Sequence, residues 1–322
     1  MGSAIYEIDR AKRQSSKIVS LMFRKKFVMC IIGETDMRKV KVAATQMSCS
    51  WNAEETLMKA DRLVREAADK GANIILIQEL FETPYFCQLQ KFEYMELAKP
   101  IEENPAVNHF KKVAKELDVV LPISFFERVG NTQFNSIAII DADGEVLGVY
   151  RKTHIPDGLP YAEKFYFTPG DTGFKVWNTK YGTIGVGICW DQWFPETARC
   201  MALLGAEILL FPTAIGSEPT LGKDSSIHWR NTMAGHAAAN MMPVIASNRI
   251  GTETDEESEM TFYGNSFIAD NHGEIVEQAD DCTEGILVHE FDLNELAKER
   301  REWGIFRDRR PEMYQTLLSH GK

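Results

Sequence analysis

Residues 185–196 read GVGICWDQWFPE, a small apolar run that leads through one cysteine into a helix start. The run predicts a buried strand that ends at Ile188 and presents the sulfur of Cys189 at the carboxyl edge of a sheet. Pro195 suits the first turn of a helix, and a helix N-terminus lowers the pKa of a nearby thiol and favours its thiolate. The stretch therefore predicts a cysteine nucleophile. A buried structural cysteine is the alternative, since free cysteine is among the most buried residue types.

Two further segments place charged side chains at comparable strand ends. Residues 71–80, GANIILIQEL, form an apolar strand that stops at Glu79, and residues 149–156, VYRKTHIP, run from a strand into Lys152. A carboxylate can take the proton of a thiol, and a lysine can hold the oxyanion that forms when a carbonyl is attacked. Each charge alone is also explained as a solvated residue at a strand end. Together with Cys189 they predict nucleophilic catalysis.

On these residues the chain resembles the nitrilase superfamily of carbon-nitrogen hydrolases, whose catalytic residues are Glu, Lys and Cys in that chain order. The resemblance covers nearly all of the chain beyond its first segment and implies catalysis by Glu79, Lys152 and Cys189. A further family signature, a Glu before an aromatic-Pro-Gly run, is matched in residues 161–170, YAEKFYFTPG. In the family this second glutamate positions the lysine and the substrate, so the resemblance gives that role to Glu163.

Within the superfamily, four stretches are similar to the enzymes that hydrolyse a carbamoylated diamine in polyamine biosynthesis: residues 189–196, 211–219, 246–251 and 303–311. This resemblance implies a small cationic carbamoyl amine as substrate. Asp191 stands where true nitrilases usually carry Glu, which argues against a nitrile. The alternative is another amidase of the superfamily, acting on a carbamoyl amino acid or an omega-amide. Such substrates end in a carboxylate and need a cation, for which Arg249 is the candidate.

A different class of protein is a non-catalytic binding or scaffold protein that keeps the same fold. The intact set of Glu79, Lys152, Cys189 and Glu163 disfavours this interpretation, because a binding module has no need of all four residues. We therefore expect an enzyme.

The order of predicted elements repeats along the chain. A strand at 39–46, a helical pattern ending at Gly71 and a strand at 74–77 are followed later by a strand at 183–188, a helix at 195–204, Gly205 and a strand at 208–211. Residues 135–146, NSIAIIDADGEV, also resemble residues 265–276, NSFIADNHGEIV, although two short matches can be convergent hairpin chemistry. We expect an α/β protein of two like halves, with two mixed sheets face to face and helices outside. The family resemblance implies the same four-layer α-β-β-α sandwich.

Substrate-binding residues are expected on the loops around the site. A cationic tail calls for an acidic or aromatic partner, and Glu218, a short loop after the strand at 208–211, is the acidic candidate. The aromatic candidates are Tyr85, Tyr161, Trp190 and Trp193. Glu218 can instead be a solvated loop acid, and the aromatic residues can belong to the core, which is their commoner place.

The composition excludes several other classes. The 322 residues are 44% hydrophobic and carry a net charge of -11, which disfavours a nucleic-acid partner and is compatible with attracting cationic small molecules. The six cysteines lack a C-x-x-C pair, the histidines show no H-E-x-x-H pattern, and residues 182–187 do not keep the G-x-G-x-x-G spacing. We therefore expect no metal and no cofactor. The scattered cysteines favour a reducing compartment, the cytoplasm.

Both ends of the chain differ from its middle. Residues 1–36 hold seven basic and four acidic side chains, a net charge of +3, and Arg24-Lys25-Lys26 interrupts their apolar runs before any is long enough to span a membrane. We expect residues 1–37 to lie outside the fold, as a segment upstream of a normal start at Met37 or as a basic targeting or membrane-surface arm. Residues 38–322 form the hydrolase domain. Its end, residues 293–318, predicts a helix and an amphipathic tail, and the family resemblance implies a homo-oligomer built from dimers.

Overall fold

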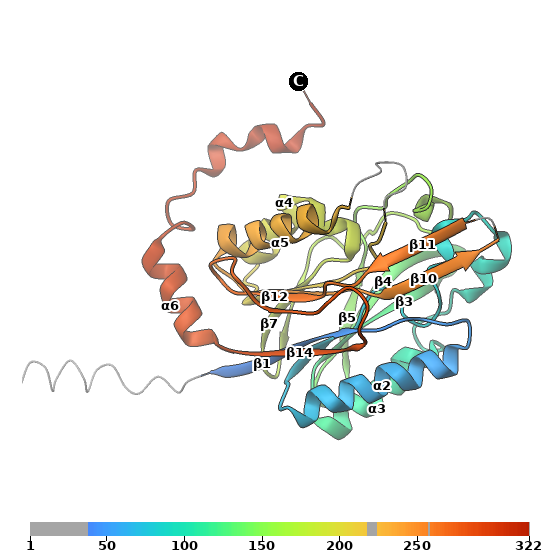
Figure 1. Cartoon of the computed structure of the whole chain (residues 1–322). Helices are drawn as coiled ribbons and strands as arrows, with labels where there is room; N and C mark the ends of the chain where they lie inside the picture. The colour runs from blue at the N-terminus through green and yellow to red at the C-terminus, as the bar shows by residue number, and fades with distance from the viewer. Residues whose placement is uncertain (1–37, 218–223, 257, 322) are drawn as a thin grey trace, which may run out of the picture. The chain divides into compact units, whose positions relative to one another are not determined.

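The computed structural model describes residues 38–217, 224–256 and 258–321. The predictions about the N-terminal extension 1–37 and about Glu218 lie outside these residues. The described strands form a six-stranded sheet, two three-stranded sheets that the bridge between Ile74 and Val120 joins into one layer, and a separate hairpin, with helices on the outer faces (Figure 1). Within it, no helix combines the length and the apolar character needed to cross a membrane.

The first half of the chain builds one sheet. Its elements are β1 (Lys39–Gln46), α2 (Ala53–Asp69), β2 (Ile74–Leu76), α3 (Pro105–Leu117), β3 (Leu121–Val129), β4 (Thr132–Ile140) and β5 (Val146–Arg151). Strand β1 is parallel to β2, and β2 meets the start of β3 through the parallel bridge of Ile74 with Val120. Strands β3, β4 and β5 then follow as antiparallel neighbours. Three short 3₁₀ helices lie in the loops of this half, at Phe86–Gln88, Phe92–Leu97 and Glu163–Phe165.

The second half repeats this order. Its elements are β6 (Val176–Thr179), β7 (Gly182–Val186), η4 (Cys189–Trp193), α4 (Pro195–Leu203), β8 (Ile208–Pro212), α5 (Ser226–Asn240), β9 (Val244–Ser247), β12 (Phe267–Ala269) and β13 (Ile275–Gln278). Strands β7, β8 and β9 are parallel, and β9, β12 and β13 are antiparallel neighbours. Strand β6 lies antiparallel to β7, as β14 (Gly285–Asp292) lies antiparallel to β1. The two sheets thus have the same strand order and directions, which confirms the predicted internal duplication.

Two pairs of glycines occupy equivalent places in the halves. Gly71 and Gly205 precede β2 and β8 with φ of +86° and +104°. Gly144 and Gly273 lie in the turns from β4 to β5 and from β12 to β13, with φ of +84° and +85°. A Cβ on either would lie 2.5 or 2.6 Å from a backbone oxygen of α3 or α5. Because only glycine combines a left-handed backbone with so close an approach, these turns are a true repeat.

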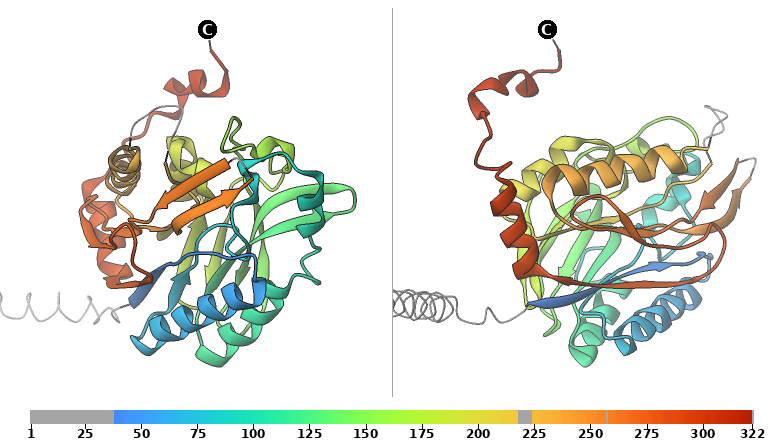
Figure 2. Two further views of the ribbon diagram at one scale, coloured as in Figure 1. Left: turned by 45° about the vertical axis from the view of Figure 1, so that its right-hand side comes forward. Right: turned by 60° about the vertical axis from the view of Figure 1, so that its left-hand side comes forward.

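The core has a layer between the sheets and a layer beneath the helices. Along β1, Val42 and Ala44 belong to a core cluster that includes residues of the second sheet, whereas Ala43 packs with residues of α2 and α3. This alternation is the period of a strand that is buried on both faces. Helices α2 and α3 cover the first sheet, and α4 and α5 cover the second (Figures 1 and 2). The predicted α-β-β-α sandwich is therefore confirmed.

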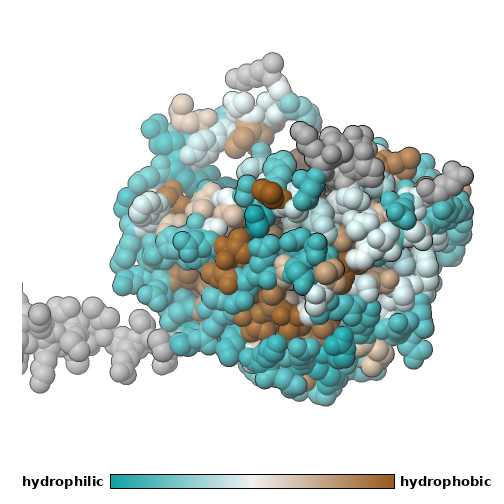
Figure 3. Space-filling view, viewed as in Figure 1, coloured by the Kyte–Doolittle hydropathy of each residue, from teal (hydrophilic) through white to brown (hydrophobic). Residues whose placement is uncertain are grey.

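Two parts depart from the repeat. The hairpin of β10 (Ile250–Asp255) and β11 (Ser258–Tyr263) interrupts the connection from β9 to β12. The chain ends in α6 (Leu293–Trp303) and two 3₁₀ turns, Pro311–Met313 and Gln315–Leu318, which form a tail in Figure 1. Figure 3 shows hydrophobic residues in separate areas of one face, including an area on this tail.

Candidate active site

Cys189 lies on a sharp turn after the first parallel strand of the second half. Strand β7 ends at Val186, two residues before the predicted end at Ile188. Cys189 opens η4 with φ of +41°, a left-handed conformation that is costly for a residue with a Cβ. Its Sγ lies 3.7 Å from the carbonyl oxygen of Ala214, just beyond β8. Backbone strain of this kind persists where the surroundings hold a residue in place, and it is frequent at active sites.

The carboxylate of Asp191 holds this turn. Its Oδ2 accepts from the backbone N–H of Ile188 at 3.0 Å and from the hydroxyl of Tyr150 at 2.7 Å. Its Oδ1 accepts from the backbone N–H of His154 at 3.0 Å and lies 2.7 Å from Nδ1 of the same residue. The strand ends early because the N–H of Ile188 bonds to this carboxylate. Since Tyr150 and His154 flank Lys152, the buried Asp191 links the cysteine turn to the lysine loop.

Lys152 lies between two glutamates. Its Nζ is 2.8 Å from Oε1 of Glu79, and 2.9 and 2.6 Å from the two carboxylate oxygens of Glu163. None of the three side chains has exposed surface. Glu79 follows β2 and Lys152 follows β5, so side chains that are distant in sequence meet beyond the ends of their strands. Cys189 lies within electrostatic range of all three.

The charges of this cluster favour a protonated lysine. Burial favours the neutral amine, but the carboxylates of Glu163 and Glu79 outweigh burial and raise the pKa of Lys152 well above its ordinary value. Burial raises the pKa of Glu163, and Glu79 adds to this effect while Lys152 opposes it. The cluster therefore keeps an ammonium ion between two carboxyl groups away from water.

The same surroundings favour the neutral thiol of Cys189. Burial, and after it the carboxylate of Glu79, raise the pKa of the Cys189 thiol well above its ordinary value, with Lys152 opposing them in part. The sequence-based prediction of a thiolate favoured by a helix N-terminus is therefore wrong. The local segment is a short 3₁₀ helix, and burial together with the nearby carboxylate has the larger effect.

The two carboxylate oxygens of Glu79 have different surroundings. Oε1 accepts from Lys152 and, at 2.7 Å, from Nδ2 of Asn135. Oε2 is buried and has no hydrogen-bond partner in the described part of the chain. A buried carboxylate oxygen without a partner is available to accept a proton, which is one requirement of a general base.

Sequence reasoning did not include Asn135 and Asp191 in the site. Asn135 donates to Glu79, and its carbonyl accepts from the backbone N–H of Lys152 at 2.8 Å. Both residues are in stretches quoted above, Asn135 in the repeated motif and Asp191 two residues after the cysteine. The available signal was a polar residue within an apolar run, since a buried polar group is almost always hydrogen-bonded.

The structure separates the aromatic candidates for substrate contact. Tyr85 is 1% exposed and donates its hydroxyl to Oε1 of Glu163 at 2.7 Å, so it supports the lysine cluster. Tyr161 packs edge-on against Tyr85, with ring centroids 5.8 Å apart. Trp190 is 38% exposed, and Trp193 lies 6.3 Å from it between ring centroids. Among the described residues the indole nitrogen of Trp193 has no hydrogen-bond partner.

Arg249 does not fit the role of binding a substrate carboxylate. Its side chain has no exposed surface. Nη2 donates to the carbonyl oxygens of Glu79 and Leu80 at 2.8 and 3.0 Å, and Nη1 pairs with Oε1 of Glu253 at 2.9 Å. The alternative in which this cation binds a substrate carboxylate is disfavoured, because both terminal nitrogens bond inside the protein and the Nε, which has no hydrogen-bond partner among the described residues, is buried.

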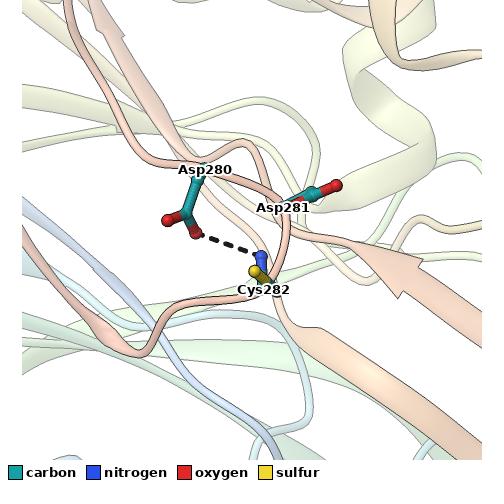
Figure 4. Close-up of side chains that lie close together, drawn as sticks. All are labelled: Asp280, Asp281 and Cys282. Atoms are coloured by element: carbon teal, nitrogen blue, oxygen red, sulfur yellow. Dashed lines mark hydrogen bonds between the residues drawn. The ribbon is translucent and has the colours of Figure 1, made fainter.

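Three side chains of metal-ligand type lie close together in the described residues, Asp280, Asp281 and Cys282 (Figure 4). They are exposed on the turn before β14. Oδ1 of Asp280 accepts from the backbone N–H groups of Cys282 and Thr283 at 3.1 and 2.6 Å. An aspartate side chain that bonds to backbone N–H groups two and three residues later stabilises its own turn. This role explains the position of Asp280 without a metal ion.

Fold and site together define the class of protein. A strained, buried cysteine and a buried Glu-Lys-Glu cluster on a duplicated sandwich are the features expected of a hydrolase that attacks amide-type carbon-nitrogen bonds. The family model for carbon-nitrogen hydrolases matches residues 41–301, and the chain belongs to this family.

Known proteins of the family are similar to most of this chain. An N-carbamoylputrescine amidase from Oryza sativa subsp. japonica is 60% identical over 286 residues, 87% of this chain and 95% of that protein. A citrullinase from Francisella tularensis is 55% identical over 283 residues, 88% of this chain and 99% of that protein. The crystal structure of a carbon-nitrogen hydrolase from Helicobacter pylori has a TM-score of 0.83 at 38% identity, covering 88% of this chain and 100% of that one.

Proposed function

We propose that this enzyme hydrolyses N-carbamoylputrescine to putrescine, carbon dioxide and ammonia. The observation that carries the reaction type is the free Oε2 of Glu79 in the buried cluster that holds Lys152, Glu163 and the neutral thiol of Cys189. The choice of substrate rests on the similarity to the N-carbamoylputrescine amidase from rice, which is 60% identical over 95% of its length.

The first half of the reaction forms a thioester. Glu79 takes the thiol proton of Cys189 as the sulfur bonds to the carbamoyl carbon of R-NH-CO-NH2. The ammonium of Lys152 and the backbone N–H of Trp190 stabilise the oxyanion. The bond to the terminal nitrogen then breaks as the proton passes from Glu79 to that nitrogen. Ammonia departs, and the thioester R-NH-CO-S remains on Cys189.

The second half of the reaction releases the amine. Water attacks the thioester while Glu79 takes one of its protons, and the carbon-sulfur bond breaks. That proton returns to the sulfur and restores the neutral thiol. The product R-NH-COOH decomposes to carbon dioxide and the free amine. Lys152 keeps its proton throughout, which the raised pKa of its ammonium group supports.

The cationic end of the substrate needs partners outside this cluster. We assign Trp190 and Trp193 to cation-π contacts with the substrate ammonium. We assign Glu218 to an ion pair with the same ammonium, on the basis of the sequence alone. Glu218→Gln is expected to raise KM for N-carbamoylputrescine far more than KM for the neutral N-carbamoylbutylamine. Equal effects on both substrates would remove Glu218 from the site.

Citrulline is the second candidate substrate, because the Francisella relative is 55% identical over 99% of its length. Citrulline carries the same carbamoyl group and ammonium, with an added carboxylate beside the ammonium. The buried position of Arg249, the cation expected for a carboxylate, favours the amine without that group.

The test is the release of ammonia and amine from N-carbamoylputrescine, N-carbamoylbutylamine and citrulline, with Cys189→Ala as control. We expect the highest kcat/KM for N-carbamoylputrescine and no turnover by the control. Faster turnover of citrulline would keep the thiol chemistry and overturn the substrate.

We also propose a homo-oligomer in which the C-terminal tail contacts a second copy of the chain, and a cytoplasmic setting. Large apolar side chains of the segment after α6 are exposed, among them Met313, Leu317 and Leu318. The cysteines of the described residues are all free, in agreement with a reducing compartment. Truncation after Gly304 is expected to lower the mass in solution, and an unchanged mass would overturn the role of the tail.

A further inference from the structure

The two halves differ in one connection that lies close to the site. In the first half a two-residue turn, Gly130 and Asn131, joins β3 to β4. At the equivalent point of the second half, the chain between β9 and β12 contains Arg249 and the hairpin β10–β11. This inserted segment contacts the loop that follows Glu79, because Arg249 and Glu253 both bond to it.

Arg249 fixes the backbone on which Glu79 is carried. Its Nη2 donates to the carbonyl oxygens of Glu79 and Leu80, and its Nη1 lies 3.3 Å from the carbonyl oxygen of Thr83. Leu80 has φ of +47°, a left-handed conformation that a leucine adopts only when its surroundings hold it. The planar guanidinium can bind several acceptors in one fixed geometry, which a lysine cannot reproduce.

Glu253 connects the same arginine to the second glutamate of the cluster. Its Oε1 accepts from Arg249 at 2.9 Å, and its Oε2 accepts from the backbone N–H of Tyr85 at 2.5 Å. The hydroxyl of Tyr85 donates to Glu163 at 2.7 Å. The ring of Tyr85 also lies 5.8 Å from the guanidinium. One buried ion pair is therefore bonded to the segment that carries Glu79 and to Tyr85, whose hydroxyl in turn bonds to Glu163.

We propose that Arg249 and Glu253 are positioning residues that place Glu79 and, through Tyr85, Glu163 around the catalytic lysine. The ion pair acts on catalysis through these contacts and does not touch the substrate. The inference rests on the proposed cysteine chemistry and deepens it, and it does not depend on which carbamoyl compound the enzyme uses.

A purely structural role would also explain a buried ion pair, since removing one partner leaves an unpaired charge inside the protein. The two roles differ in what they predict for a variant that folds. A structural pair changes thermal stability and leaves kcat as it was. A positioning pair lowers kcat, leaves KM nearly constant and slows the reaction of the thiol.

The experiment compares Glu253→Gln and Arg249→Lys with a control in another arginine ion pair, Arg65→Lys. Arg65 pairs with Asp61 at 2.8 Å and with Glu116 at 2.8 Å on the helices of the first half. Glutamine offers one acceptor where the carboxylate offers two, so Glu253→Gln keeps one of the contacts to Arg249 and Tyr85. Four quantities are measured: kcat and KM for N-carbamoylputrescine, the rate of Cys189 alkylation by iodoacetamide followed at its peptide, and Tm.

We expect Glu253→Gln and Arg249→Lys to lower kcat by about 100-fold, with KM within about threefold, because small displacements of catalytic groups cost about that much. Cys189 alkylation should slow in both, since Glu79 must receive the thiol proton. Arg65→Lys should change only Tm. A normal kcat in a folded variant of either residue, or an equal loss of kcat in Arg65→Lys, would overturn the proposal.

Tyr85→Phe keeps the test decisive if both variants fail to fold, because it removes only the hydroxyl. It is expected to lower kcat by about tenfold, the effect of one charge-assisted hydrogen bond, and a normal kcat would overturn the path to Glu163. Alkylation needs no carbamoyl substrate. A wild-type enzyme that does not turn over N-carbamoylputrescine, with slow alkylation in Glu253→Gln, would overturn the proposed substrate and support the positioning pair.

Discussion

The two halves of this enzyme end the same strand in different ways. Strand β2 of the first half is followed by Glu79, and β8 of the second half is followed by Thr213 at the equivalent position, given the offset of 134 between Gly71 and Gly205. The two positions touch, because the backbone N–H of Glu79 donates to the carbonyl oxygen of Thr213 at 3.4 Å. The same local fold thus presents an ionisable group on one side and a hydroxyl on the other.

This difference shows how a duplicated fold becomes an active site. The core strands and the glycine turns are alike in both halves, because packing constrains them. The residues just beyond the strand ends are free to diverge. The first half supplies Glu79 and Lys152, and the second half supplies Cys189, so neither half has the full set.

The largest expected effect comes from removing the ionisable group that follows β2, so that neither strand end carries one. Glu79→Gln keeps the shape of the side chain and removes the base, so kcat/KM should fall by about 10³-fold, within the range for a general base. The matched change on the other side, Thr213→Ser, keeps a hydroxyl and should alter kcat/KM by no more than about twofold. Steady-state kinetics check both. Comparable losses in the two variants would mean that the halves contribute alike to this step.

A smaller effect is expected where the halves are tied together. Asp191→Asn replaces an acceptor with an amide that cannot satisfy the N–H groups of both Ile188 and His154, so the cysteine turn should shift relative to Lys152. We expect a loss of about 100-fold in kcat. The control is Asp171→Asn, which affects an exposed carboxylate bonded to Arg151. If kcat of Asp191→Asn matches wild type in a folded protein, the link between the halves has no catalytic role.

The glycine turns test whether the halves are equivalent in packing. Gly144→Ala and Gly273→Ala each force a Cβ toward a helix carbonyl at a left-handed backbone, and each should lower the free energy of unfolding by about 2 kcal/mol or more. Gly235→Ala, inside α5 with no atom near the added Cβ, should raise it by about 0.5 to 1 kcal/mol. Urea unfolding gives all three values. A large loss of stability for only one of the two turn variants would show that the halves share a strand order but differ in how tightly their turns pack.

An effect confined to alkaline pH is expected at Cys189, where residues of the two halves meet. The pKa of the Cys189 thiol is raised in the folded state, so its contribution is present below the ordinary value of 9.0 and is lost as pH rises toward the folded pKa. Above pH 9 the free energy of unfolding of wild type should fall by up to about 1.4 kcal/mol per pH unit more than that of Cys189→Ala. Parallel curves for the two proteins would mean that the folded thiol ionises as readily as the unfolded one.

Much of the fold follows from the sequence because its signals are local. The alternating pattern predicts β1 with its observed bounds, Lys39–Gln46, and Pro195 marks the start of α4. The repeated turns around Gly144 and Gly273 predict the duplication, since a left-handed backbone leaves a glycine signature in the sequence. Glu79, Lys152 and Cys189 each follow a strand, so the sequence predicts that they meet at a common edge once the strands are assigned.

What the sequence did not predict depends on long-range contacts. Arg249 reaches the carbonyl of Glu79 across 170 positions of the chain, and a solvated or substrate-binding arginine has the same local pattern. The thiolate prediction failed for the same reason. Local helix geometry favours ionisation of Cys189, whereas burial and the carboxylate of Glu79, which comes from the other half, oppose it.

The most direct test of the central claim is the mass of the Cys189 peptide after an acid quench during turnover of N-carbamoylputrescine. We predict an adduct on Cys189 that retains the putrescine carbons, because ammonia leaves before the amine, and no adduct or turnover in Cys189→Ala. Full turnover by Cys189→Ala, or an adduct that lacks the putrescine carbons, would contradict the account.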